Sequence, residues 1–66
     1  MRITLNGKEQ ETAAATVAEL LATMKLDEAQ FLAVSRNGTV VKRGDWTATA
    51  LAAGDTIDIL TIVGGG

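Results

Sequence analysis

The chain has 66 residues, which is the size of one small domain. Its net charge is −2 and its basic residues form no stripe, so no nucleic-acid partner is expected. It contains no Cys and no His, which excludes disulfides and the usual zinc sites, and we expect no metal and no bound cofactor. No apolar run approaches the roughly 20 residues that span a bilayer, and the N-terminus lacks a signal-peptide core, so we expect a cytoplasmic protein with no membrane partner.

Residues 1–12 predict a β-hairpin. Residues 1–5 alternate between apolar and polar side chains, as in a half-buried strand. Asn6 and Gly7 follow, and both tolerate the positive φ of a tight type I′ turn. Residues 8–12 are polar throughout, which suits a return strand at or near a sheet edge.

One main helix is predicted, over about residues 17–25. Thr16 and Glu19 match a capping box, in which each side chain bonds a backbone N–H at the helix start. Four apolar side chains then recur at helical spacing and form a stripe that we expect to face the core: Val17, Leu20, Leu21 and Met24. A short helical turn capped by Asp27 is expected at residues 27–30.

A second hairpin is predicted after the helix. Residues 31–36 form an apolar stretch with Leu32 and Val34 on one face. Asn37-Gly38 repeats the tight-turn signal, and residues 39–41 begin the return strand.

The last part of the chain predicts an irregular crossover and a final strand. We expect Trp46 and Leu51 to anchor the crossover, residues 42–53, against the core. A turn at residues 53–55 leads into the best strand candidate of the sequence, residues 56–63.

This order of elements predicts an α+β fold, with a mixed sheet of four or five strands packed on one main helix. The first and last strands are the most apolar, so we expect them side by side and parallel at the sheet centre. The larger candidates for the core are Ile3, Leu5, Val17, Leu20, Leu21, Met24, Leu26, Phe31, Leu32, Val34, Val40, Val41, Trp46, Leu51, Ile57, Ile59, Leu60, Ile62 and Val63.

Residue types that commonly carry catalysis are scarce, so an enzyme is not expected. Ser35 is the only serine, and no histidine accompanies it as a base. The acidic residues are scattered, and we expect them to be solvated surface charges: Glu9, Glu11, Glu19, Asp27, Glu28, Asp45, Asp55 and Asp58.

Alternation along the last strand predicts apolar side chains on its outer face. If Ile57 points at the helix, then Asp58, Leu60 and Ile62 point the opposite way, and this keeps the Asp58 carboxylate out of the core. With Val63, the two outer apolar residues are expected to form a partner-docking patch. The alternative is a β-bulge that flips the register and buries Leu60 and Ile62.

Three glycines, Gly64, Gly65 and Gly66, close the sequence, and we expect them to form a flexible tail on a domain of residues 1–63. A backbone without Cβ atoms is thin and can approach another surface closely. Taken alone, such a tail is equally compatible with a frayed chain end.

Four features occur together: the hairpin and capped helix in this order, residues 43–46 in the crossover, Gly54-Asp55 before the last strand, and the ending Val63-Gly64-Gly65-Gly66. With them the whole chain resembles the sulfur carrier proteins of bacterial thiamine biosynthesis. That family has the ubiquitin-like β-grasp fold, which agrees with the α+β arrangement predicted from the residues.

The resemblance implies a protein co-substrate that does not itself catalyse the reaction. An E1-like adenylyltransferase would consume ATP to adenylate the Gly66 carboxylate. Sulfur drawn from cysteine through a desulfurase relay would then give a thiocarboxylate. Thiazole synthase would take this sulfur for the thiazole moiety of thiamine. Gly64 and Gly65 would give the carboxylate access to enclosed active sites, which exclude water.

Other functions share these features. A carrier with the same chemistry could serve another pathway, as the small subunit of molybdopterin synthase or in amino-acid, tRNA or siderophore sulfur transfer. The chain could also be a ubiquitin-like interaction module with an inert tail, or a ubiquitin-like modifier that is joined to lysines.

Overall fold

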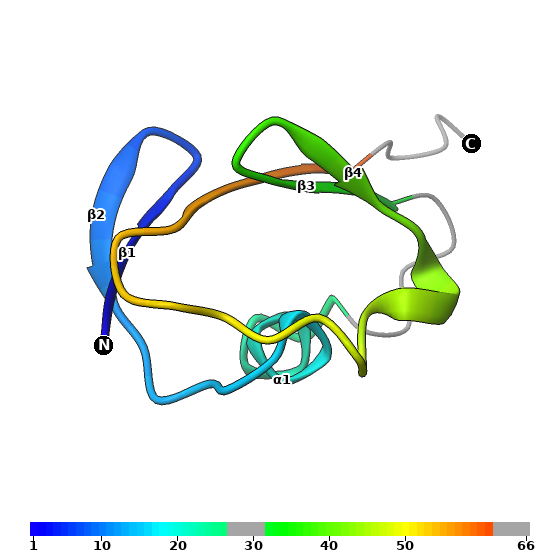
Figure 1. Ribbon diagram of the computed structural model, residues 1–66, viewed down its shortest axis with the longest axis horizontal. Coiled ribbons are helices and arrows are strands. Elements are labelled where there is room, and N and C mark those ends of the chain that lie inside the picture. Colours follow the sequence, from blue (N-terminus) through cyan, green and yellow to red (C-terminus); the bar gives the residue numbers. More distant parts are fainter. Residues whose placement is uncertain (27–31, 62–66) are drawn as a thin grey trace.

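The computed structural model describes residues 1–26 and 32–61, and Figure 1 shows a curved sheet with one α-helix packed against it. Five strands form the sheet in the order β2-β1-β5-β3-β4. The strands are β1 Arg2–Leu5, β2 Lys8–Glu11, β3 Leu32–Arg36, β4 Thr39–Val41 and β5 Thr56–Thr61, and the helices are α1 Val17–Thr23 and the 3-10 helix η1 Arg43–Asp45. The predicted α+β arrangement is confirmed, with five strands. The helical turn predicted at residues 27–30 lies outside the described residues.

Strands β1 and β5 lie side by side and run parallel at the sheet centre, as predicted. Thr4 lies opposite Thr56, and Leu5 lies opposite Ile57. On its other side β5 pairs antiparallel with β3, from Arg36 opposite Ile57 to Leu32 opposite Thr61. The strand that leads to the C-terminal segment is therefore held from both sides.

Both Asn-Gly pairs form the predicted hairpin turns. Asn6 and Gly7 have φ values of 49° and 83°, and Asn37 and Gly38 have values of 52° and 85°. Positive φ at both central positions is the signature of a type I′ turn, which joins antiparallel strands with a fixed register. The all-polar strand β2 is exposed along its length and lies at a sheet edge, as predicted.

The capping box starts α1 as the sequence predicts. The Glu19 N–H donates to Thr16 Oγ1 at 3.2 Å, and the Thr16 N–H donates to Glu19 Oε2 at 3.1 Å. Val17, Leu20 and Leu21 are buried, so the apolar stripe faces the core. Among the described residues no helix is long and apolar enough to cross a membrane.

Helix α1 ends at Thr23, two residues earlier than predicted. Lys25 adopts a left-handed φ of 60°. Its N–H donates to the Ala22 carbonyl at 3.1 Å, and the Leu26 N–H donates to the Leu21 carbonyl at 2.8 Å. This is a Schellman ending, which glycine usually forms. Lysine occupies the left-handed position here, so the usual sequence signal for the stop is missing.

Replacing Thr16 with alanine is expected to lower the free energy of unfolding by about 1 kcal/mol, because it removes the acceptor for the Glu19 N–H. Chemical denaturation followed by circular dichroism measures the change. Thr47→Ala is the matched control, since Thr47 is exposed and lies outside α1. Equal effects of the two substitutions would contradict the role of the cap.

The core lies between α1, the crossover and the helix-facing side of the sheet. Partly buried side chains, among them Met24, Leu32 and Ile59, pack around it. Of the predicted core residues, Val40 and Leu60 are errors, because both are exposed. Phe31, Ile62 and Val63 lie outside the described residues. The buried apolar residues are Ile3, Leu5, Ala14, Val17, Leu20, Leu21, Val34, Trp46, Leu51 and Ile57.

Trp46 and Leu51 anchor the crossover, as predicted, and both are buried. The indole N–H of Trp46 donates to the Val41 carbonyl at 3.1 Å, which ties the crossover to strand β4. Arg43, at the start of η1, lies over the Trp46 ring at 4.7 Å from its centroid. The prediction of an irregular segment omitted this short helix.

Asp55 was predicted to be a solvated surface charge, and this prediction is wrong. Only 6% of the residue is exposed. Its carboxylate accepts hydrogen bonds from Arg36 Nε at 2.7 Å, Asn37 Nδ2 at 3.0 Å and the Ala52 N–H at 2.8 Å. Burial alone raises the pKa of the Asp55 carboxyl group, but the hydrogen bonds from Ala52, Arg36 and Asn37 and the Arg36 charge outweigh burial and lower this pKa. The buried carboxylate joins the β3–β4 hairpin to the start of β5.

Candidate functional site

The outer side chains of β5 decide which surface adjoins the C-terminal segment. Ile57 is fully buried, whereas Leu60 is 63% exposed. Asp58 is exposed as well. The predicted alternation is thus confirmed from Ile57 to Leu60, and no bulge buries Leu60. The other predicted site residues, Ile62, Val63, Gly64, Gly65 and Gly66, lie outside the described residues, so their roles stay predictions.

Asn6 supports β5 beyond its last β1 partner. The Asn6 N–H donates to the Ile57 carbonyl at 2.9 Å, and the Ile59 N–H donates to Asn6 Oδ1 at 2.7 Å. The side-chain amide thus takes the place of a main-chain acceptor where the first hairpin turns away. This bond holds the part of β5 that carries Leu60 against the rest of the sheet.

Leu60 lines a shallow hollow of about 310 Å³, which we call the open-face depression. Its outward-pointing side chains come from the adjacent strands β4, β3 and β5. They are neighbours because Ala33 lies opposite Leu60 and Ser35 lies opposite both Asp58 and Val40. These side chains alternate with the buried Val34 and Ile57, so they point away from α1. The lining residues are Ala33, Val34, Ser35, Val40, Asp58, Ile59 and Leu60.

Val40 belongs to this surface and not to the core. It is 72% exposed. The Asn37-Gly38 turn sets Val34 opposite Val41 and Ser35 opposite Val40. Because Val34 is buried, Val41 shares its inward face and Val40 points outward. The two-residue turn already fixes this register in the sequence, so the outward direction of Val40 was predictable.

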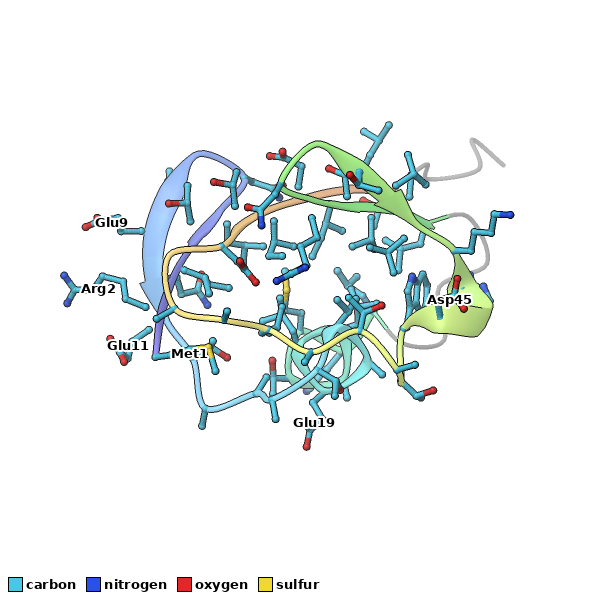
Figure 2. All side chains as sticks on the ribbon, in the orientation of Figure 1. Met1, Arg2, Glu9, Glu11, Glu19 and Asp45 are labelled. Atoms are coloured by element: carbon cyan, nitrogen blue, oxygen red, sulfur yellow. The ribbon has the colours of Figure 1, made fainter. Side chains whose placement is uncertain are left out.

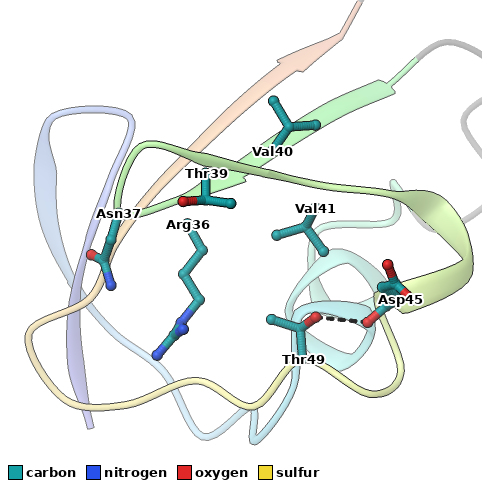
Figure 3. Close-up of a pocket in the computed structure, with 7 residues that line it drawn as sticks. All are labelled: Arg36, Asn37, Thr39, Val40, Val41, Asp45 and Thr49. Atoms are coloured by element: carbon teal, nitrogen blue, oxygen red, sulfur yellow. Dashed lines mark hydrogen bonds between the residues drawn. The ribbon is translucent and has the colours of Figure 1, made fainter.

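A second depression, of about 340 Å³, lies between the β3–β4 hairpin and the crossover (Figure 3). Arg36 is the only cation among its described lining residues, and its guanidinium already binds Asp55. On the crossover side, Thr49 Oγ1 donates to the Asp45 carbonyl at 2.7 Å. Because the cation is paired, we assign no anionic ligand to this depression. Its lining residues are Arg36, Asn37, Thr39, Val40, Val41, Asp45 and Thr49.

Within residues 1–26 and 32–61, no group of three or more His, Cys, Asp or Glu side chains could hold a metal ion. The features that remain for a function are the supported end of β5, the open-face depression beside it and the glycines that follow in the sequence.

The sheet has a central parallel β1–β5 pair with a hairpin on each side, and one capped helix packs on one face. This arrangement defines a ubiquitin-like β-grasp domain. Within this class, the family model described as the ThiS family matches residues 3–66, and the chain belongs to that family.

Two solved structures of relatives have the same fold. The crystal structure of the thiamine biosynthesis protein ThiS from Geobacter metallireducens is 36% identical to this chain, with a TM-score of 0.82 and 100% of both chains covered. The NMR solution structure of a thiamine biosynthesis protein from the same organism is 36% identical, with a TM-score of 0.81, and the match covers 100% of this chain and 88% of that one.

A much longer protein contains a similar segment. A thiazole synthase from Paramagnetospirillum magneticum is 33% identical over 67 residues. The match covers 100% of this chain but 20% of that relative, so the chain spans about a fifth of its length. In that protein the similar segment is therefore part of a larger polypeptide.

Proposed function

We propose that this chain is a sulfur carrier protein that supplies the sulfur of the thiazole moiety of thiamine. Membership of the ThiS family over residues 3–66 carries the proposal. The thiamine biosynthesis protein that is 36% identical over its full length supports the pathway. The thiazole synthase with a similar segment supports the sulfur acceptor, because there the two functions would reside in one polypeptide.

The proposed reaction takes place on the main-chain carboxylate of Gly66 and requires that this carboxylate is free. An unactivated carboxylate is a poor acyl donor, because its oxygen is a poor leaving group. An E1-like adenylyltransferase joins the carboxylate to the AMP part of ATP and releases pyrophosphate. A persulfide from a desulfurase relay then displaces AMP, and a thiol cleaves the resulting acyl disulfide to leave a thiocarboxylate. Thiazole synthase accepts the sulfur, and an oxygen atom taken up in exchange restores the carboxylate of the carrier.

The three glycines suit this reaction because an acyl adenylate must be kept from water inside an enclosed site. Gly64 and Gly65 present a backbone without side chains, which passes a narrow entrance. Ordering such a tail costs conformational entropy. Burial of apolar area around Leu60, together with Ile62 and Val63, offsets this cost and holds the tail at the entrance. The carrier is in this scheme a substrate of both partner enzymes.

Replacing Leu60 with aspartate is expected to weaken binding of the activating enzyme about tenfold or more, because it removes apolar contact area and adds a charge that must lose its water. The free energy of unfolding should change by less than about 1 kcal/mol, since the side chain is 63% exposed. Titration calorimetry and chemical denaturation measure the two quantities. An unfolded variant would show that Leu60 is a structural residue.

Partner selection tests the pathway. The intact chain is immobilised and offered thiazole synthase and the large subunit of molybdopterin synthase, each purified. We expect the chain to retain thiazole synthase, and the sulfur-loaded chain to support thiazole formation in a reconstituted assay. Retention of the molybdopterin-synthase subunit, with no thiazole formed, would assign the carrier to the other pathway.

A further inference from the structure

Asn6 extends the hydrogen-bond ladder of the central strand beyond the end of β1. The Thr4 N–H donates to the Asp55 carbonyl at 2.8 Å. The Asn6 N–H makes the next bond, to the Ile57 carbonyl at 2.9 Å. The main chain then turns away, but the ladder continues, because the Ile59 N–H donates to Asn6 Oδ1 at 2.7 Å. Among the described residues, this side-chain bond is the last one that β5 receives from the β1 side.

The second hairpin turn binds the same strand in the same way where the strand begins. The Asn37 N–H donates to the Thr56 carbonyl at 2.8 Å, and the Thr56 N–H donates to Asn37 Oδ1 at 2.9 Å. Both asparagines hold the first central position of a type I′ turn, with φ values of 49° for Asn6 and 52° for Asn37. Glycine also satisfies a positive φ. The two side-chain acceptors therefore add contacts to β5 that the turns themselves do not require.

The hairpin that carries Asn6 gives this contact a fixed support. Strands β1 and β2 pair antiparallel along their whole length. Arg2 Nη1 lies 3.8 Å from Glu9 Oε2, and Arg2 Nε lies 3.7 Å from Glu11 Oε2. Figure 2 shows Arg2 between these two carboxylates at the β1–β2 end of the sheet. Cross-strand pairs of opposite charge favour one register of a hairpin, so its turn, and with it Asn6, stays in place beside β5.

The bond from Ile59 lies close to the part of the chain that reacts. Leu60 follows Ile59 directly, and Gly66 lies seven positions beyond Ile59 in the sequence. Hydrogen bonds near the end of a strand open more readily than those at its centre. The apparent affinity for a partner falls in proportion to the fraction of molecules that hold the binding conformation. A side chain that closes the end of β5 in the free chain therefore strengthens binding without contacting the partner.

We propose that Asn6 is a positioning residue for the sulfur-carrier reaction, and that its Oδ1 fixes the end of β5 in the conformation that both partner enzymes bind. The inference rests on the proposed function. It gives the Asn6-Gly7 signal a role beyond the turn, since glycine at position 6 would satisfy the turn but would not hold Ile59. Because the conformation belongs to the free chain, loss of Asn6 Oδ1 should weaken both complexes by the same factor.

Replacing Asn6 with glycine removes the acceptor and keeps a residue that suits the positive φ. One net hydrogen bond shifts an equilibrium by about fivefold. The dissociation constants for the activating enzyme and for thiazole synthase should therefore both rise about twofold to fivefold. The rate of sulfur loading at a saturating concentration of the chain should stay at the wild-type value, because the loss is one of binding. Titration calorimetry and initial rates, both well below the unfolding midpoint, measure these quantities.

Asn6→Asp is the rescue variant, because aspartate also suits the turn and keeps an acceptor oxygen at the same position. It should restore both dissociation constants to the wild-type values. Asn37→Gly is the matched control, with the same change in the same type of turn on the same strand. It also removes the bond from Asn37 Nδ2 to Asp55, so it should lower the unfolding midpoint more than Asn6→Gly does. The dissociation constants of this control should nevertheless stay at the wild-type values.

Amide hydrogen exchange in the free chain tests the physical basis without any enzyme. In Asn6→Gly, the Ile59 amide should exchange about fivefold faster relative to the Thr56 amide. In Asn37→Gly the ratio should change in the opposite direction. Global unfolding exposes both amides alike, so their ratio reports local opening of β5. An unchanged ratio in Asn6→Gly would overturn the proposal.

The outcomes separate this inference from the carrier function. If the wild-type chain gains sulfur but Asn6→Gly binds both enzymes like the wild type, the positioning role is overturned and the carrier function stands. A loss with one enzyme alone, or a loss that Asn6→Asp does not restore, would indicate a direct contact and would also overturn the positioning role. A larger loss of affinity in Asn37→Gly would show that binding follows global stability, with the same consequence. If the wild-type chain gains no sulfur from an active enzyme, both proposals fail.

Discussion

Replacing Asp55 with alanine is expected to lower the free energy of unfolding by about 2–4 kcal/mol, because it leaves Arg36, Asn37 and the Ala52 N–H without their shared acceptor. The upper end of the usual range for a broken ion pair is not expected, since Arg36 is partly exposed and water can reach it. A domain of this size is stabilised by only about 3–10 kcal/mol in total. The thermal unfolding midpoint should therefore fall by more than about 10 °C. The denaturant concentration at the unfolding midpoint should fall as well.

Asp58→Ala is the matched control for this prediction. Asp58 is also an aspartate at β5, but it is exposed and has no ion pair with the described residues. The control should change the free energy of unfolding by less than about 0.5 kcal/mol. A similar loss from both substitutions, or a wild-type midpoint for Asp55→Ala, would contradict the structural role of the buried carboxylate.

Acid should remove the contribution of Asp55 in the wild-type protein. Hydrogen bonds and the Arg36 charge lower the pKa of Asp55 in the folded state, relative to about 3.9 in an unfolded chain. Its contribution to stability is therefore present above the unfolded pKa and is lost as pH falls through the folded pKa. Denaturant unfolding between about pH 5 and pH 2 should show this loss in the wild type and a smaller one in Asp55→Ala. Parallel pH profiles for the two proteins would exclude this linkage.

Deleting Gly66 is expected to reduce sulfur loading at least about a hundredfold. The deletion moves the carboxylate back by one residue, about 3.5 Å along an extended chain. A misplacement of about 1 Å can already cost a reaction about a hundredfold. Loading is measured as the rate of thiocarboxylate formation with ATP, the activating enzyme and a sulfur source. The fold should be unaffected, because the strands of the sheet and the buried core residues named above lie within residues 2–61.

The matched variant adds one glycine after Gly66, so that only glycines still follow Val63. It should fail in loading as the deletion does, because the carboxylate lies one residue too far. Binding of the activating enzyme through Leu60 should stay within about threefold of the wild type for both variants, since their docking residues are unchanged. Full loading of either variant would show that the position of the carboxylate is not critical.

Local signals explain why so much of the fold could be predicted. Asn6-Gly7 and Asn37-Gly38 each need only their own backbone preferences to form a turn. The Thr16 capping box depends on residues three positions apart. Alternation from Ile57 to Leu60 gave the two faces of β5, because Asp58 marks the solvent side.

Contacts between distant residues explain the errors. Asp55 bonds Arg36, which lies 19 positions earlier, and only the assembled sheet brings the two together. No pattern near Asp55 distinguishes it from a solvated carboxylate. The end of α1 was misplaced because Lys25 takes a left-handed conformation that usually signals glycine.

The candidate site was predicted in part. The exposure of Leu60 followed from strand alternation. Val40 was placed in the core because it is apolar, and the pairing of residues 31–36 with residues 39–41 was not used to decide which way it points. Applying the Asn37-Gly38 turn to the pairing of β3 with β4 would have turned Val40 outward. The depression that Val40 forms with Leu60 depends on the order of β4, β3 and β5 in the sheet, which the sequence did not specify strand by strand.

The most direct test of the role of Gly66 is a mass measurement on the intact chain. The chain is first incubated with ATP, the activating enzyme and a sulfur source. A sulfur carrier gains the mass difference between one sulfur and one oxygen atom, fragmentation places the gain on Gly66, and omission of ATP prevents it. An unchanged mass, obtained with an enzyme that activates another carrier under the same conditions, would contradict the carrier function, and so would sulfur found on any other residue.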